Sequence, residues 1–332
     1  MMERGEVFMT GHKVKVVVTG CNYPSLDVER KVLEEIDPEF VEAHCVTEEE
    51  VIATAKDADG ILNQYAPITG RVIESLKRCR VITSYGVGVD NIDVEAATEH
   101  GIIVANVPDY CVDEVSTHAM ALILACLRKV PYLSTTVKRG KWDFMVGKPL
   151  FRSQGRVLGL FGLGRIGRAV AGKATGFNFR IIAYDPYISE VNEKVELVSF
   201  SELLSNSDFI CIHAPLTEET KHSFGKEEFK AMKKNAYLIN TARGAIVDEL
   251  ALYRALKEGW IAGAALDVME KEPPDSKNPL LRLDNVIITP HISYYSEESY
   301  VELKAKAAQA VLDVLKGGLP KATVNPQVVK RK

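Results

Sequence analysis

The chain has 332 residues, 46% of them hydrophobic and 26% charged, so we expect a folded protein of about two domains rather than a disordered chain. Its 41 basic and 45 acidic side chains leave a formal net charge of −4, which disfavours nucleic acid as a partner. No apolar run approaches the roughly 20 residues of a membrane span, so no membrane partner is expected. Six scattered cysteines without a C-x-x-C pair indicate reduced thiols in a cytoplasmic protein, and no metal site is expected.

Short apolar runs alternate with helical patterns along the first third of the chain. The apolar runs predict buried strands at 13–19, 58–62, 80–84 and 102–105, and the helical spacing predicts helices at 25–35 and 69–77. Strands that alternate with helices favour a parallel sheet covered by helices on both faces.

A long helix is predicted at 112–130, and Pro131 is expected to end it because proline has no amide hydrogen and clashes with the preceding turn. The irregular segment 138–149 carries Trp142 and Phe144, and it either contacts another subunit or covers its own sheet. A second series of strands is predicted at 156–161, 179–184, 208–213, 236–240, 262–268 and 286–289, followed by a last helix at 298–315. Two such series predict two doubly wound parallel-sheet α/β domains.

The most informative stretch is a glycine-rich turn, GLGRIG, between a predicted strand and a predicted helix. Gly162 permits the tight turn, Gly164 lets the backbone approach a pyrophosphate, and Gly167 allows close packing of helix and strand. Asp185 follows Gly167 by 18 positions, at the end of the next strand, where an acid can hold both ribose hydroxyls. Because a carboxylate repels a 2′-phosphate, the pattern predicts a Rossmann domain that binds NAD rather than NADP.

Three further side chains, Arg243, Glu272 and His291, follow predicted strands of the second series. Reduction of a 2-keto acid requires a cation that holds the carboxylate, an acid that protonates the carbonyl oxygen, and a group that keeps this acid charged. Ligands of open parallel sheets bind beyond the carboxyl ends of the strands, so the three are candidate catalytic residues. Taken singly, each also fits an ordinary role as a surface ion pair, a solvated loop acid or a turn histidine.

The order of the motifs GLGRIG, YDP, HAPLT, NTARG, LDVMEKEP and TPHIS resembles the D-isomer-specific 2-hydroxyacid dehydrogenase family. The similarity extends to GVGVDN at 86–91 and NVP at 106–108, so it covers nearly the whole chain. The resemblance implies a dehydrogenase in which Arg243 anchors the substrate, Glu272 is the partner of the histidine, and His291 is the acid and base. Further NAD contacts are implied for Arg165, Ile166, Thr241, Ala242 and Asp267.

The family fold implies a flavodoxin-like substrate domain, formed by 1–108 and 299–332, and an NAD-binding Rossmann domain at 109–298. Backbone amides of Val87 and Gly88 in the substrate domain are implied to hold the substrate carboxylate. Family members dimerise through the NAD-binding domain, which suits the segment that carries Trp142.

Within the family, HISYYSE at 291–297 most resembles the branch of the C-terminal-binding proteins and similar phosphoglycerate dehydrogenases. That branch includes transcriptional corepressors, so an NADH-responsive binding module is the alternative function. If the protein is an enzyme, phosphoglycerate, glyoxylate and hydroxypyruvate are the alternative substrates. Tyr294 stands where this branch has an aromatic residue beside the variable substituent of the substrate, so it is a candidate specificity residue. We expect a small to medium 2-keto acid without a phosphate.

Overall fold

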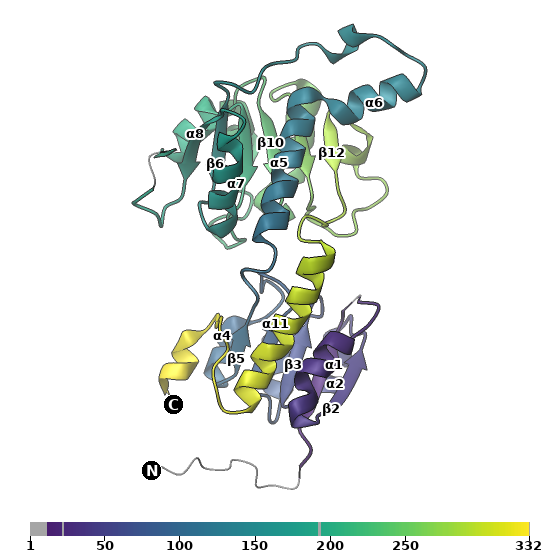
Figure 1. The fold of residues 1–332 in the computed structure, drawn as a ribbon, viewed down its shortest axis with the longest axis vertical. Coiled ribbons are helices and arrows are strands. Elements are labelled where there is room, and N and C mark those ends of the chain that lie inside the picture. Colours follow the sequence, from purple (N-terminus) through teal and green to yellow (C-terminus); the bar gives the residue numbers. More distant parts are fainter. Residues whose placement is uncertain (1–11, 22, 192–193, 332) are drawn as a thin grey trace. The chain divides into compact units, whose positions relative to one another are not determined.

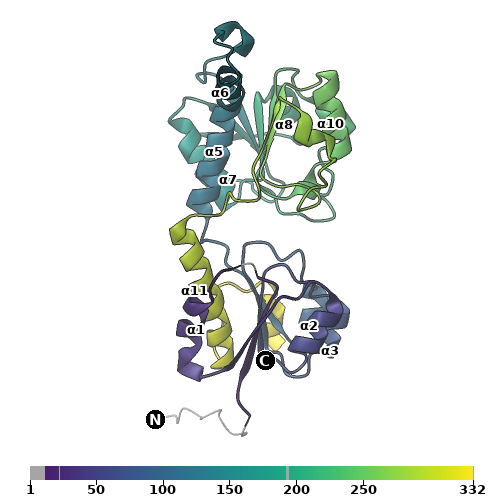
Figure 2. The ribbon, with the colours of Figure 1, turned by 90° about the vertical axis from the view of Figure 1, so that its right-hand side faces the viewer.

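A computed structural model of the chain describes residues 12–21, 23–191 and 194–331. The chain forms two units, the first running to Tyr110 and resuming at Glu297, the second spanning Cys111–Ser296. Each unit is a parallel sheet between layers of helices (Figures 1 and 2). The predicted class, two parallel-sheet α/β domains, is confirmed.

The first unit has a five-stranded sheet in the order β2-β1-β3-β4-β5, in which all neighbours are parallel. This is the flavodoxin-like order, with the reversal of strand order beside β1. α1 and α11 cover one face of the sheet, and α2 and α3 cover the other (Figure 2). The strands are β1 (Lys15–Thr19), β2 (Glu39–Ala43), β3 (Gly60–Asn63), β4 (Val81–Ser84) and β5 (Ile103–Ala105). The helices are α1 (Asp27–Leu33), α2 (Glu48–Ala55), α3 (Gly70–Ser75), α4 (Val94–Glu99) and α11 (Glu297–Leu315).

The second unit has a seven-stranded parallel sheet in the order β12-β11-β10-β9-β6-β7-β8, and its strand order reverses beside β6. α5 and α7 cover one face, and α8 and α10 cover the other (Figure 2). The strands are β6 (Val157–Phe161), β7 (Arg180–Tyr184), β8 (Val195–Leu197), β9 (Phe209–Ile212), β10 (Tyr237–Asn240), β11 (Gly263–Leu266) and β12 (Val286–Ile288). The helices are α5 (Val112–Arg128), α6 (Val130–Lys138), α7 (Arg165–Thr175), α8 (Phe200–Asn206), α9 (Lys226–Ala231) and α10 (Glu249–Glu258).

The predicted helix at 112–130 is two helices, and the prediction that Pro131 ends it is wrong. α5 ends at Arg128, because Lys129 adopts a left-handed conformation with φ of 51°. Pro131 lies in the first turn of α6, where an amide hydrogen has no partner within the helix and its absence costs nothing. α6 leaves α5 at 59°, and a short 3-10 helix, Phe144–Gly147, follows in the segment predicted to be irregular.

The chain beyond α11 returns to the edge of the first sheet. The buried Asn325 side chain accepts a hydrogen bond from the Val104 amide at 2.8 Å and donates one to the Ile102 carbonyl at 2.9 Å. A 3-10 helix, Pro326–Arg331, follows, in which Val328 is buried. Residues 323–328 therefore complete this edge of the sheet.

Over the described ranges, none of the single helices combines the length and the apolar composition that a membrane span requires. One bent pair, α5 with α6, meets the test of length and composition when the two are taken together.

Candidate active site

The glycine-rich turn connects β6 to α7 and leaves no room for side chains at two positions. Gly162 has φ of +95°, and a Cβ added there lies 2.6 Å from the Ala214 amide nitrogen. A Cβ added at Gly167 lies 2.4 Å from the Gly162 carbonyl oxygen. Gly164 precedes the first residue of α7, and nothing lies within 4 Å of its added Cβ. The turn therefore offers an open approach to the N-terminus of an 11-residue helix, a favourable place for phosphate groups.

Asp185 belongs to the same edge of the sheet because β7 lies beside β6. Its Oδ2 accepts a hydrogen bond from the Leu163 amide at 2.9 Å, and its Oδ1 accepts one from the Tyr187 amide at 3.0 Å. The carboxylate is thereby fixed to the glycine turn. Arg165 is exposed and Ile166 is half-buried, both in the first turn of α7.

Two buried polar atoms on neighbouring strand ends have no hydrogen-bond partner among the described residues. One is Oγ1 of Thr241, after β10, and the other is Nε2 of His213, after β9 and beside the glycine turn. Burial lowers the pKa of His213 to about 4, so its imidazole is neutral at physiological pH. The two atoms, the three glycines of the turn and the fixed Asp185 fit a dinucleotide, because each offers a place for one of its polar groups.

The backbone at Arg243 is held by two hydrogen bonds of the Asn240 side chain, which we call the Asn240 clamp and which the sequence analysis did not predict. Asn240, fully buried at the end of β10, accepts a hydrogen bond from the Ala242 amide at 3.0 Å and donates one to the Arg243 carbonyl at 2.8 Å. Nη1 of Arg243 donates to the Ala242 carbonyl at 2.8 Å. An asparagine that ends an apolar strand, as in NTARG, is the sequence signal for such a clamp.

His291 and Glu272 form a close pair. Nδ1 of His291 lies 2.6 Å from Oε2 of Glu272, and Oε1 of Glu272 accepts a hydrogen bond from the Met269 amide at 3.0 Å. Burial raises the pKa of Glu272, but the hydrogen bonds and the positive charges of His291 and Arg243 outweigh it, so the pKa lies below its usual value. An ionised Glu272 fixes the proton of His291 on Nδ1, so Nε2 is the ring nitrogen that can exchange a proton.

The remaining predicted residues divide between the units. The Tyr294 ring lies edge-on to His291, with centroids 6.2 Å apart and planes at 80°. Asp267 is 1% exposed and binds the turn that carries His291. Val87 and Gly88 belong to the first unit, where Asn106 Nδ2 donates to the Val87 carbonyl at 2.7 Å and Ser84 Oγ donates to the Gly88 carbonyl at 2.8 Å.

A second histidine–glutamate pair lies on the same sheet edge but outside the predicted set. Nε2 of His222 lies 2.6 Å from Oε1 of Glu270. No group of three or more histidine, cysteine, aspartate or glutamate side chains within the described part of the chain is arranged to hold a metal ion.

Comparison with known proteins identifies the family of the chain. Residues 120–293 match the family model described as "D-isomer specific 2-hydroxyacid dehydrogenase, NAD binding domain", and the match lies wholly within the second unit. The chain therefore belongs to the D-isomer-specific 2-hydroxyacid dehydrogenase family and carries its NAD-binding domain.

Several relatives and solved structures resemble the chain over most of its length. It is 46% identical to a D-3-phosphoglycerate dehydrogenase of Methanocaldococcus jannaschii over 325 residues, which cover 96% of this chain and 61% of that protein. It is 42% identical to a glyoxylate reductase of Korarchaeum cryptofilum over 290 residues, 84% of this chain and 86% of that protein. The structure of an Aquifex aeolicus D-lactate dehydrogenase complexed with NAD and lactic acid matches with a TM-score of 0.83 and 29% identity, covering 96% of this chain and 98% of that one.

The first testable prediction concerns the glycine turn. In Gly167→Ala, the new Cβ meets the Gly162 carbonyl, so we expect the affinity for NADH to fall about 10-fold or more and Tm to decrease, because overpacking costs about 1–3 kcal/mol. Gly172→Ala is the matched control on the same helix, since nothing lies within 4 Å of its Cβ. Fluorescence titration with NADH and thermal unfolding provide the measurements. A Gly167→Ala protein with the affinity for NADH and the Tm of the unmutated protein would contradict the role of this turn in NADH binding.

Proposed function

We propose that the protein is an NAD-dependent 2-hydroxyacid dehydrogenase that interconverts a small 2-keto acid and its 2-hydroxy acid. The observation that carries this proposal is the His291–Glu272 contact of 2.6 Å, near the positive charge of Arg243. Bound NADH would supply the hydride. Arg243 binds the substrate carboxylate, and Nε2 of His291 gives its proton to the carbonyl oxygen of the substrate. Glu272 stabilises the imidazolium before this transfer, and the oxidation uses the same groups in reverse.

For the cofactor we assign Gly162, Gly164 and Gly167 to the pyrophosphate and Asp185 to the adenosine ribose. Arg165, Ile166, Thr241, Ala242 and Asp267 remain predicted cofactor contacts. The alternative of an NADH-responsive binding module is not favoured, because the named relatives are dehydrogenases and reductases. NADH-dependent reduction of 2-keto acids, followed by the loss of NADH absorbance, tests the proposal, and no turnover on glyoxylate, hydroxypyruvate or longer 2-keto acids would refute it.

The scattered cysteines, five of which are buried, fit a reducing compartment, so we further propose a cytoplasmic location.

The second testable prediction concerns the charge of His291. In Glu272→Gln, the imidazolium loses its anionic partner, so the reductive kcat/KM should fall on the order of 10-fold or more at neutral pH, since a positioned general acid contributes about 10²–10⁴-fold. The decline of activity at high pH should move to lower pH, because an anion favours the protonated form and its removal disfavours it. The pH profile of kcat/KM measures both effects.

Glu270→Gln is the matched control, because Glu270 contacts His222 at the same distance of 2.6 Å on the same loop. The control should keep the activity and pH profile of the unmutated protein. If the two variants behave alike, or if the high-pH decline does not move in Glu272→Gln, then Glu272 does not hold the charge of His291.

We propose that the substrate carries no phosphate. The support is the lack of basic residues in the loops at the carboxyl edge of the first sheet. Residues 20–26, 64–68 and 85–91, which follow β1, β3 and β4, contain no lysine or arginine. Nη1 of Arg80, at the opposite end of β4, donates to the Leu315 carbonyl at 3.1 Å, and Nη2 donates to the Val314 carbonyl at 2.8 Å. A phosphate group requires cationic donors, which these loops lack.

The third testable prediction follows from these loops and from Tyr294. Among glyoxylate, hydroxypyruvate, 4-methylthio-2-ketobutyrate and phosphohydroxypyruvate, we expect the phosphorylated substrate to have the lowest kcat/KM. Tyr294→Ala should change the ranking of the other three, because the Tyr294 ring lies beside His291 and we propose that it borders the variable substituent of the substrate. Tyr295→Ala, which changes the next and partly exposed tyrosine, should leave the ranking intact. A clear preference for phosphohydroxypyruvate would refute the substrate assignment, and an unchanged ranking in Tyr294→Ala would remove that residue from it.

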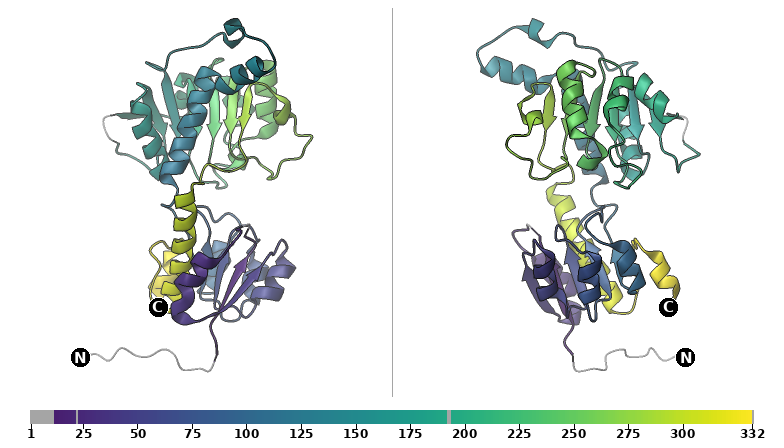
Figure 3. Two further views of the ribbon diagram at one scale, coloured as in Figure 1. Left: turned by 45° about the vertical axis from the view of Figure 1, so that its right-hand side comes forward. Right: turned by 180° about the vertical axis from the view of Figure 1, so that it is seen from behind.

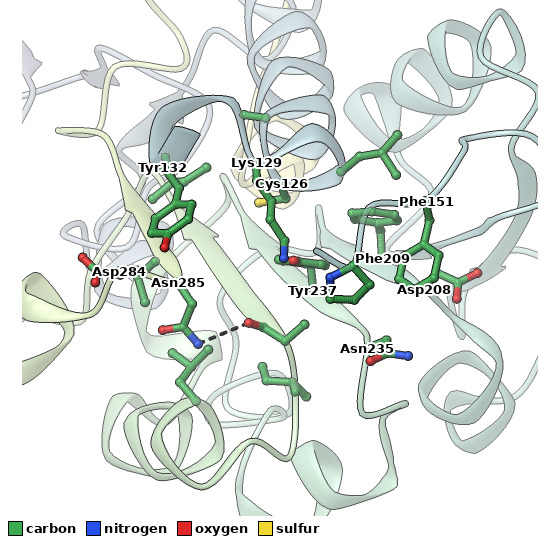
Figure 4. A pocket seen from close by; sticks show the side chains of 18 of the residues that line it. Cys126, Lys129, Tyr132, Phe151, Asp208, Phe209, Asn235, Tyr237, Asp284 and Asn285 are labelled. Carbon is green, nitrogen blue, oxygen red and sulfur yellow. Dashed lines mark hydrogen bonds between the residues drawn. The ribbon is translucent and has the colours of Figure 1, made fainter. Parts of the chain in front are cut away.

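We also propose a homodimer formed through the NAD-binding unit. α6 and the segment after it, at 130–151, extend from the end of α5 (Figure 3). They carry a cluster of exposed apolar side chains that includes Trp142, 90% exposed, and Phe144, 81% exposed. Beneath this segment, at the starts of β6, β9, β10 and β12, lies a cavity of about 510 Å³ lined by Tyr132, Phe151 and Tyr237 among others (Figure 4). Exposed aromatic side chains beside an apolar hollow favour contact with a second copy.

The fourth testable prediction concerns this contact. Trp142→Lys combined with Phe144→Lys should convert a dimer to a monomer, because charges at the centre of an apolar interface are desolvated without partners. Light scattering after gel filtration measures the mass. Leu250→Lys, which changes another exposed apolar residue, on α10, is the control and should remain dimeric. A monomeric unmutated protein, or a double variant that stays dimeric, would contradict the proposal.

A further inference from the structure

The turn that carries His291 is bound to the interior of the NAD-binding unit through Asp267. The Asp267 carboxylate is fully buried and follows β11 directly. Its Oδ1 accepts hydrogen bonds from the Thr289 hydroxyl at 2.6 Å and the Ile292 amide at 3.0 Å, and its Oδ2 accepts one from the Ser293 amide at 2.9 Å. The His291 amide also donates to the Asp267 carbonyl at 2.8 Å. Residues on both sides of His291 are therefore attached to one carboxylate.

The Thr289 hydroxyl connects this carboxylate to α5. Nε2 of His118 lies 3.1 Å from Oγ1 of Thr289. A hydroxyl has one proton, and Thr289 donates it to Asp267, so its oxygen must accept at the second contact. The proton of that contact therefore belongs to Nε2 of His118. The direction of donation is fixed from His118 to Thr289 to Asp267.

His118 provides this link from a firmly packed position. It lies in the middle of α5, which packs against α7, β10 and β11, and its side chain is 23% exposed. Nε2 of His118 also lies 3.7 Å from Oδ1 of Asp267. The histidine therefore packs beside the buried carboxylate as well as against the Thr289 hydroxyl.

We propose that His118 and Thr289 are positioning residues that hold the His291 turn in its reactive place through Asp267. This inference rests on the proposed function, because it assigns His291 as the acid and base. His118 and Thr289 touch no reacting atom. They act by fixing Asp267, which fixes the backbone on both sides of His291 and thereby the His291–Glu272 contact. Misplacement of a reacting group by about 1 Å can cost on the order of 100-fold in rate.

The fifth testable prediction compares pairs of substitutions at both residues. Thr289→Val removes the hydroxyl at nearly constant volume, and His118→Leu removes the donor. Each should lower kcat about 10-fold or more while KM for the 2-keto acid changes little, since the Asn240 clamp on Arg243 is untouched. Thr289→Ser and His118→Gln keep a hydroxyl and a donor at these places and should retain most of the activity. The double variant should be no slower than the slower single variant, because both break one chain of hydrogen bonds.

These kinetics decide the matter in either direction. If Thr289→Val and His118→Leu both have the kcat of the unmutated protein, the inference is overturned. A Thr289→Ser variant as slow as Thr289→Val at the same Tm would also overturn it, as would rate losses that multiply in the double variant. If Thr289→Val does not fold, the His118 pair makes the same comparison from α5.

A spectroscopic measurement separates this inference from the proposed function. The Nδ1 proton of His291, bonded to Glu272, should give a downfield proton resonance, assigned by its loss in His291→Asn. In Thr289→Val this resonance should broaden or move upfield, while the corresponding resonance of the His222–Glu270 pair stays in place. An unchanged His291 resonance would overturn the inference. The resonance does not depend on turnover, so it tests the role of His118 and Thr289 even if the unmutated protein reduces no 2-keto acid. Absence of turnover would refute the proposed function alone.

Discussion

The Asp267 carboxylate lies in the interior of the NAD-binding unit and accepts three hydrogen bonds from the turn after β12. In that turn His291 has a left-handed φ of 51°, a conformation that costs a residue with a side chain about 1–2 kcal/mol. Hydrogen bonds to a charged acceptor contribute about 1.5–3 kcal/mol each, so the carboxylate can hold the strained turn. The position of His291, and with it the contact to Glu272, depends on this buried charge.

The order of the strands determines which side chains meet. β10, β11 and β12 are consecutive and parallel, so the loops that carry Arg243, Glu272 and His291 leave the same edge of the sheet. β6 and β7 bring the glycine turn and Asp185 to that edge as well. A doubly wound sheet separates its connecting loops where the strand order reverses, and the opening beside β6 is where the glycine turn lies. The topology of the sheet thus brings the candidate cofactor-binding and catalytic residues to one edge before any side chain is considered.

Sequence patterns found the strands that are apolar on both faces and missed those that are not. β1, β3 and β4 are almost wholly buried, and their continuous apolar runs were sufficient to predict them as strands. β2 (EFVEA) and β8 (VEL) lie at sheet edges, where exposed glutamates interrupt the apolar residues, so neither shows a buried run. Pro131 misled the prediction because proline fits the first turn of one helix as well as the end of another, and only the left-handed Lys129 decides between them.

The site residues likewise divide into those that a local sequence motif predicts and those that depend on tertiary contacts. Arg243, Glu272 and His291 could be named from sequence because each follows a strand within a recognisable motif. Thr289 and His118 could not be assigned roles, because they are 171 positions apart and their contact depends on the packing of α5 against the sheet. Asn240 binds only residues two and three positions further along the chain, so its role could have been inferred from the NTARG motif. A short histidine–glutamate contact does not by itself mark an acid and base, since His222 and Glu270 form one of the same length. What distinguishes His291 is the nearby charge of Arg243 and a turn held by a buried carboxylate, and both arise from tertiary structure.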